Sequence, residues 1–312
     1  MSDSSSSKAQ SAFQSLSSII TPISIPPSQT PASYLLHDPQ IASQISTLLR
    51  QPDSGAGDNN LCRWLYDTFQ SSDPELQLVV LRFLPIIAGV YLSRVTLRKP
   101  LAGFEAVLLA LYAHETTARN GQSITVSIPD LTHPSIYHES KTATKTTSTD
   151  LNIAVISPSL EPHGTVRSTK RARIVGVALE LYFSKISQLP IGSKVDFCKF
   201  CEGWAGLEKD SVSIEGLEKV KSINDGAISL PWELLQPALR ILGHCLLGPK
   251  KNKELCKAAS AACRRLHARA LHDINPTAIL ATGSLVRLGE MTLDSDEEID
   301  HTEITMTNVI SL

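Results

Sequence analysis

Apolar residues recur at helical spacing through most of the chain, beginning shortly after residue 34. Ile41, Ile45 and Leu49 follow Asp38 on one face of an expected helix. After the polar break QPDSGAGDNN, the segment LCRWLYDTFQ (61–70) presents a second amphipathic face. The pattern therefore predicts two helices joined by a loop.

The next apolar segment, residues 72–94, differs because it is apolar on nearly every side. Ser72 or Asp73 can cap a helix here, and Pro74 fits its first turn. A helix of this kind lies in the middle of a core. Its longest unbroken apolar run, residues 83–92, is about half the length that a membrane span needs. We therefore expect a buried helix.

The period changes from helical to alternating at two places. SITVSI (123–128) and LNIAVIS (151–157) alternate and are rich in β-branched residues, which predicts a pair of short strands. A helix from Pro100 precedes them, and helices resume near Thr169. No repeat of fixed period is visible, so a regular solenoid is not indicated. The expected fold is mainly α: an irregular multi-helix bundle with a small β-hairpin insertion around 123–156.

Both ends of the chain differ in composition from the helical part. Residues 1–33 are rich in Ser and Pro, which predicts a disordered tail. Within it, the apolar piece Phe13 to Ile25 could dock transiently. Residues 34–292 form the expected helical domain. Residues 293–312 carry several acidic residues and no Lys or Arg, which predicts a flexible acidic tail.

Charge and composition narrow the classes of partner and compartment. A formal net charge of −2 gives no reason to expect nucleic acid as a partner. The start MSDSSSSKAQ lacks the apolar region of an export signal, and Ser2 stands where myristoylation needs glycine. The six cysteines are then expected as free thiols in the cytosol. Any recruitment to a membrane would depend on another protein.

Sequence motifs give no indication of catalysis. We find no HExxH, GxSxG, phosphate-binding loop or dinucleotide fingerprint. Cys198 and Cys201 form a single C-x-x-C without a second pair, so buried core thiols are favoured over a metal or redox site. We expect no enzyme, no cofactor and no metal, although a catalytic site assembled from distant residues stays open.

Two local clusters of cations could contact anionic lipid or an acidic partner, and they could equally be solvated helix ends. They keep open an alternative function, a helical module that binds phospholipid directly. The residues are Arg167, Lys170, Arg171 and Arg173 in the first cluster, and Lys250, Lys251 and Lys253 in the second.

Three segments in order carry a resemblance to a known family. They are CRWLYDTFQSSDPELQLVVLRFLPIIAGVYL (62–92), IPDLTHPSIYHE (128–139) and the helix at 172–190 with its LELYFSKIS core. Together they resemble the N-terminal domain of the hyccin family. The Ser-rich start and the short acidic end are more similar to a plant member than to vertebrate members, which have a long Ser-rich tail.

The resemblance implies a role that composition does not reveal. Hyccin-like proteins are non-catalytic adaptors that bind a tetratricopeptide-repeat scaffold and stabilise phosphatidylinositol 4-kinase alpha. A lipid-anchored protein recruits that complex from the cytosol to the plasma membrane, where it makes phosphatidylinositol 4-phosphate. The family segments mark candidate partner-facing residues that could equally belong to the core: Trp64, Tyr66, Pro134, Tyr137 and His138.

Overall fold

A computed structural model of the protein describes residues 2–21, 30–95, 101–129, 151–206, 231–248 and 252–294. These residues form eleven α-helices, two short 3-10 turns and one two-stranded sheet. In chain order the elements are α1 (Ser2–Ser17), α2 (Pro31–His37), α3 (Pro39–Arg50), α4 (Asn60–Gln70), α5 (Pro74–Val95), α6 (Ala102–Ala118), β1 (Ile124–Pro129), β2 (Leu151–Ser157), η1 (Ser168–Lys170), α7 (Arg171–Ser184), η2 (Ile186–Gln188), α8 (Ile191–Ala205), α9 (Trp232–Leu247), α10 (Lys253–His272) and α11 (Pro276–Asp294).

Side-chain caps set where several of these helices begin. The carboxylate of Asp38 accepts a hydrogen bond from the backbone N–H of Ile41 at 2.8 Å, at the start of α3. Asn59 caps α4 in the same way, Asp73 caps α5, and Asn275 caps α11. Each cap satisfies a backbone donor that the helix itself leaves free, which contributes about 1 kcal/mol. The predicted cap at Asp73 is confirmed.

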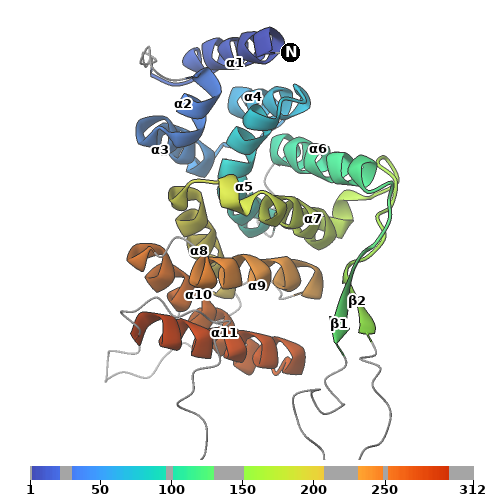
Figure 1. The fold of residues 1–312 in the computed structure, drawn as a ribbon. Helices are drawn as coiled ribbons and strands as arrows, with labels where there is room; N and C mark the ends of the chain where they lie inside the picture. The colour runs from blue at the N-terminus through green and yellow to red at the C-terminus, as the bar shows by residue number, and fades with distance from the viewer. Residues whose placement is uncertain are drawn as a thin grey trace, which may run out of the picture.

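The helices stack approximately in chain order, from α1 at one end to α11 at the other (Figure 1). The central helix, α5, packs against α2, α3 and α4 on the N-terminal side and against α7 and α8 on the C-terminal side. α10 packs against α8, α9 and α11, and α11 closes the other end (Figure 1). The prediction of a mainly helical, irregular bundle is confirmed.

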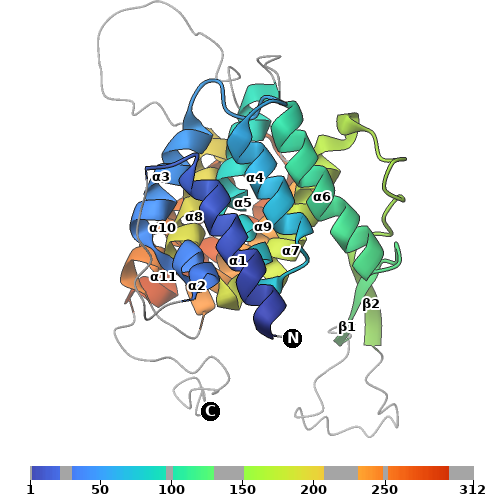
Figure 2. The same ribbon diagram turned by 90° about the horizontal axis from the view of Figure 1, so that it is seen from above.

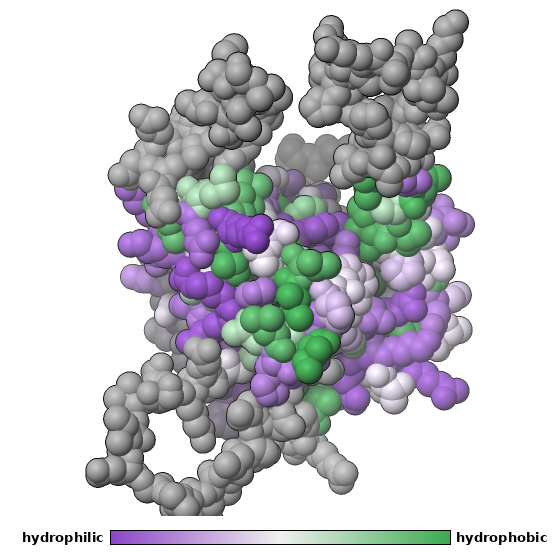
Figure 3. All heavy atoms as spheres, turned by 90° about the horizontal axis from the view of Figure 1, so that it is seen from below, coloured by the Kyte–Doolittle hydropathy of each residue, from purple (hydrophilic) through white to green (hydrophobic). Residues whose placement is uncertain are grey.

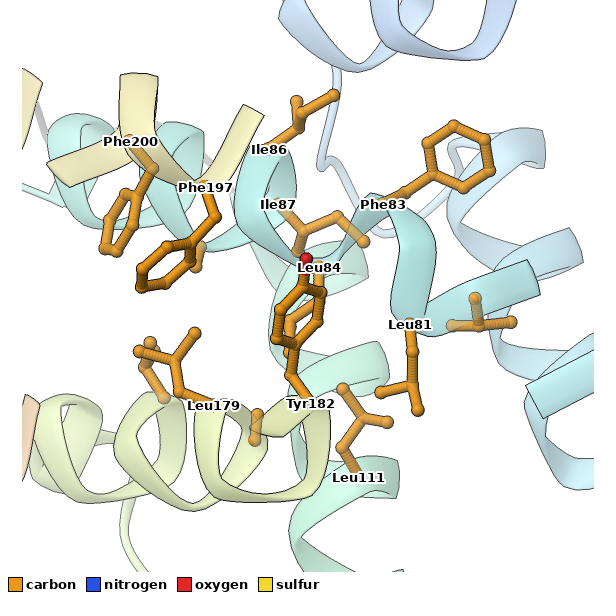
Figure 4. Packing of buried hydrophobic residues seen from close by; sticks show 14 of the residues in the cluster. Leu81, Phe83, Leu84, Ile86, Ile87, Leu111, Leu179, Tyr182, Phe197 and Phe200 are labelled. Atoms are coloured by element: carbon orange, nitrogen blue, oxygen red, sulfur yellow. The ribbon is translucent and has the colours of Figure 1, made fainter. Parts of the chain in front are cut away.

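The core is built around α5, whose side chains are buried on most sides. Figure 4 shows its aliphatic and aromatic residues meeting those of α6, α7 and α8. Burying a large apolar side chain of this kind contributes about 1.5–3 kcal/mol. The labelled members are Leu81, Phe83, Leu84, Ile86, Ile87, Leu111, Leu179, Tyr182, Phe197 and Phe200.

Among the described residues, α5 is the one helix long and apolar enough to cross a membrane by length and composition. Its apolar window is, however, 78% buried inside the protein. That burial is typical of a core helix, because a spanning helix would expose its side chains to lipid. The expected central position of this helix is confirmed.

The two strands form the predicted β-hairpin, which extends away from the helical body (Figures 1 and 2). β1 and β2 are antiparallel, with Val126 opposite Ala154 and Ser127 opposite Ile153. The register shifts between Ile124 and Thr125, where the ribbon leaves the body. We call this ribbon the β arm.

The N-terminal segment corrects one prediction. Residues 2–17 form α1, and α2 begins at Pro31, so a disordered tail over residues 1–33 is wrong for these parts. Ser-rich composition conceals the small apolar stripe of α1, which becomes helical because it packs against α2 and α4. Residues 22–29 and the acidic segment 295–312 lie outside the described residues.

Candidate interaction surfaces

The β arm exposes β-branched residues on both of its faces. The side chains of Ile153 and Val155 are 73% and 61% exposed, and they share one face with the partners Ser127 and Thr125. Val126 lies on the opposite face and is also exposed. A two-stranded ribbon is only marginally stable in water when neither face is covered. The β arm is therefore a candidate contact surface for another protein.

A buried polar cluster fixes the base of the β arm to the helical body. The guanidinium of Arg119, on the turn after α6, donates to the hydroxyl of Ser157 at 2.8 Å. It also lies 3.4 Å from the carboxylate of Glu115 and 3.6 Å from that of Glu180. Burial raises the pKa of Glu180, and the hydroxyl of Ser157 and the charge of Arg119 partly oppose that rise. The β arm is thus held in a defined direction relative to α6 and α7.

A second apolar surface lies at the end of the stack, on the outer side of α11 and the turn before it. Ile274 and Leu280 are 79% and 75% exposed, and Leu271 and Met291 are each more than half exposed. Figure 3 shows hydrophobic side chains gathered on the face seen from this end. Ile274 also has a φ of 50°, which is uncommon for a β-branched residue. Large uncovered apolar residues of this kind mark interaction sites.

Two of the residues from the family segments lie on opposite sides of α4. Trp64 is buried, and its indole N–H donates to the backbone carbonyl of Ala12 in α1 at 2.9 Å. Tyr66 is exposed. Trp64 therefore belongs to the packing beneath α1, and Tyr66 is available at the surface. The other candidates, at positions 134, 137 and 138, lie outside the described residues.

The first cationic cluster is largely engaged with the protein itself. Lys170 pairs with Glu161, and the guanidinium of Arg171 lies 3.9 Å from a carboxylate oxygen of Glu105. Two residues after Arg171, the guanidinium of Arg173 donates to the backbone carbonyl at position 159 at 2.7 Å. Arg167 is exposed. Most of the charge in this cluster is thus neutralised or used structurally.

The second cationic cluster is described only at its last member. Lys253 is exposed at the start of α10, and positions 250 and 251 lie outside the described residues.

The C-x-x-C thiols point into the core, where two further cysteines approach them. Cys198 and Cys201 on α8 are fully buried, with Cys245 of α9 and Cys263 of α10 nearby. A hydrogen bond to Cys245, together with burial, raises the pKa of Cys198, and burial raises that of Cys201. Within the described ranges, no group of three or more His, Cys, Asp or Glu side chains is arranged to hold a metal ion. The favoured interpretation as core thiols agrees with this placement.

The unfolded protein should react with a thiol reagent at all six cysteines. In the same time, the native protein should consume less than about one equivalent of the reagent. Burial raises the pKa of Cys62 to about 11 and that of Cys263 to about 12, so the reactive thiolate is scarce near neutral pH. Absorbance of released thionitrobenzoate measures the reaction, with guanidinium-unfolded protein as the control. Rapid labelling at Cys198 or Cys201, located by mass spectrometry, would instead indicate a reactive pair.

A surface hollow of about 280 Å³ lies between α5 and α8. Pro85, Gly89 and Phe200 form part of its floor, and the carboxylate of Asp196 pairs at its rim with Arg50 at 3.2 Å. Its volume lies near the lower limit for a small-molecule site. The charged side chains that line the hollow are those of Arg50, Asp196 and Lys199.

Comparison with known families decides the assignment. The family model described as hyccin matches residues 27–310. The chain belongs to the hyccin family. The match includes both apolar surfaces and nearly every described element, and it confirms the resemblance carried by the three sequence segments. Helix α1 lies before the matched region, since it ends at Ser17.

The two apolar surfaces were not among the residues that the hyccin resemblance selected. Alternation in 151–157 signals a strand, but it does not reveal that neither face is covered by a helix. The pattern of α11 likewise places Leu280 and Met291 on one stripe. It does not reveal that, within the described residues, this stripe is left uncovered. Exposure of these side chains depends on the arrangement of the stack.

Proposed function

We propose that this chain is a non-catalytic adaptor subunit of a phosphatidylinositol 4-kinase complex. The observation that carries the proposal is the hyccin family match over residues 27–310. In this role the chain binds a tetratricopeptide-repeat scaffold and stabilises the kinase, thereby supporting synthesis of phosphatidylinositol 4-phosphate. It is a cytosolic protein that a lipid-anchored partner recruits to the plasma membrane.

The two apolar surfaces support an adaptor because they offer separate contact sites at different places on the fold. The β arm projects from the side of the stack, and the outer face of α11 closes one end (Figure 1). A protein that joins two partners needs two such places. Aliphatic side chains exposed in the isolated chain would be buried in the complex, which favours association.

The alternative of direct phospholipid binding needs cations that are free to approach a membrane. In the first cluster, Lys170, Arg171 and Arg173 are engaged with Glu161, Glu105 and a backbone carbonyl. Juxtamembrane binding gains about 1 kcal/mol for each available cation. The cluster therefore offers little beyond Arg167.

Affinity purification from cells tests the proposal and the two surfaces together. The tagged wild-type chain should retain a large lipid kinase and a repeat scaffold, identified by mass spectrometry. Changing Ile153 and Val155 to Asp, or Leu280 and Met291 to Asp, should lower that recovery at least about tenfold for one pair. Because these residues are exposed, circular dichroism of each variant should match that of the wild type.

Ser43→Asp is the matched control, because Ser43 is an exposed polar residue on α3, away from both apolar surfaces. Its recovery of partners should equal that of the wild type. Isolation of the wild-type chain alone under gentle conditions contradicts the adaptor role. Recovery of the kinase by every variant would keep the adaptor role and exclude the two surfaces as its contacts. Sedimentation of the purified chain alone with anionic liposomes would favour the lipid-binding alternative.

A further inference from the structure

Helix α1 has the properties of a ligand bound to the family domain. It lies before the hyccin match, which begins at residue 27, and residues 18–30 join it to α2. It covers one end of the stack, where it rests on α2 and α4 (Figures 1 and 2). The matched region therefore carries a face that α1, a segment outside the match, occupies.

The contact uses a narrow stripe of small and aliphatic side chains. Ala9, Ala12 and Leu16 follow one another at intervals of three and four residues, and all three are buried. Beside them, the ring of Phe13 lies 6.3 Å from that of Tyr34 on α2. Small residues at the centre let the two backbones approach, and the leucine fills the remaining space. This is the pattern of an amphipathic helix in a groove.

Three polar contacts orient α1 on this face. The indole N–H of Trp64 donates to the Ala12 carbonyl at 2.9 Å, in the middle of the stripe. The ammonium of Lys8 donates to a backbone carbonyl of the turn after α4 at 3.0 Å. Beyond the helix, the backbone N–H of Thr21 donates to the side-chain carbonyl of Gln44 at 3.0 Å. Without α1, the face would present the indole of Trp64, with its N–H donor unused, among apolar side chains.

The sequence of α1 does not favour a helix by itself. Eight of its 16 residues are serine, which is a weaker helix former than alanine, leucine or lysine. Isolated helices of this length are marginal in water even when rich in alanine. The helical conformation of α1 therefore depends on its contact with the groove. In this it is like a segment that folds when it binds.

We propose that the face formed by α2 and α4 is a helix-binding groove and that α1 is its ligand in cis. Because α1 is joined to the domain through one short connection, it can leave as a unit and return. While it is away, the groove is open to a partner's helix with the same pattern of two small residues and a leucine. This inference does not depend on the assignment to a kinase complex.

Cleavage between α1 and α2 in the intact chain tests the proposal. A protease site is inserted within residues 22–29, the purified protein is cut, and a fluorescent peptide of residues 1–21 is added. The peptide should exchange with the cut segment and raise the fluorescence anisotropy to a saturable plateau. Leu16→Asp in the peptide should weaken binding more than about tenfold, because it places a charge in the buried stripe. Gln14→Asp, on the exposed side, should change it less than about twofold.

Hydrogen exchange on the uncut protein gives a second, independent measurement. If α1 detaches as a unit, its amides should exchange at least about 100-fold faster than those of α5, all at a similar rate. Equal protection of α1 and α5 would overturn the proposal. So would a cut segment that never exchanges with the labelled peptide, or a domain that unfolds once α1 is released. Each of these results would make α1 an integral part of the core.

Discussion

Replacing Gly176 with alanine should lower the free energy of unfolding by about 2–3 kcal/mol, although alanine is the better helix former. Gly176 lies on α7 where the start of α9 crosses it. A Cβ atom at this position would lie well inside the contact distance of the backbone carbonyl oxygen of Glu233. A backbone atom cannot rotate away as a side chain can, so α7 and α9 must move apart. That movement opens the core that both helices share.

Thermal and chemical unfolding followed by circular dichroism measure this effect. For a protein of this size, a loss of 1 kcal/mol lowers Tm by roughly 2–4 °C. Gly203→Ala is the matched control, because Gly203 lies on α8 and a Cβ there meets no atom within 4 Å. It should be neutral or raise stability by up to about 1 kcal/mol. The same sign for both substitutions would show that the close approach of α7 and α9 is not as described.

Replacing Arg94 with methionine should lower the free energy of unfolding by about 3 kcal/mol. The guanidinium of Arg94 reaches from the last turn of α5 to the end of α3. It donates to the carbonyls of Arg50 and Gln51 at 3.1 and 2.6 Å, and to both the carbonyl and the hydroxyl of Ser54 at 2.8 Å. Methionine fills similar space but leaves these acceptors without their donor. Hydrogen bonds to a charged group contribute about 1.5–3 kcal/mol, and such losses are not additive.

Urea unfolding of Arg94→Met and of Arg63→Met separates this role from a general loss of positive charge. Arg63 pairs only loosely with Asp67, at 3.9 Å, and both side chains are mostly exposed. Its replacement should cost less than about 0.5 kcal/mol. Equal losses of unfolding free energy at the two positions would contradict the prediction. The hydrogen bonds from Arg94 would then contribute nothing specific to the packing of α3 against α5.

Features decided within a few neighbouring residues could be predicted from the sequence. The cap at Asp73 and the proline after it place the start of α5, and the apolar surface of that helix indicates its central position. The alternation in 123–128 and 151–157 predicts the β arm, because a period of two is specific to strands. The ordered family segments predict the hyccin assignment, which the match over 27–310 confirms.

Features decided between distant segments could not be predicted in this way. The stripe on α1 is too short to stand out among serines, and it becomes helical only on the α2–α4 face. The sequence leaves Trp64 open between the core and a partner-facing surface, and the packing of α1 over it decides for the core. Lys170 and Arg171 belong to a cluster of cations in the sequence, but their acidic partners lie outside that cluster. Local composition contains no information on such pairings.

The central position of α5 has a consequence for how the chain is made. α5 is complete at Val95, whereas α8, which covers much of its C-terminal half, ends only at Ala205. A ribosome adding about 5–20 residues per second needs roughly 5–20 s to synthesise the intervening segment. During that interval α6 and α7 emerge, but the face of α5 that packs against α8 stays uncovered. Newly synthesised molecules should therefore depend on chaperones that bind apolar segments until α8 emerges.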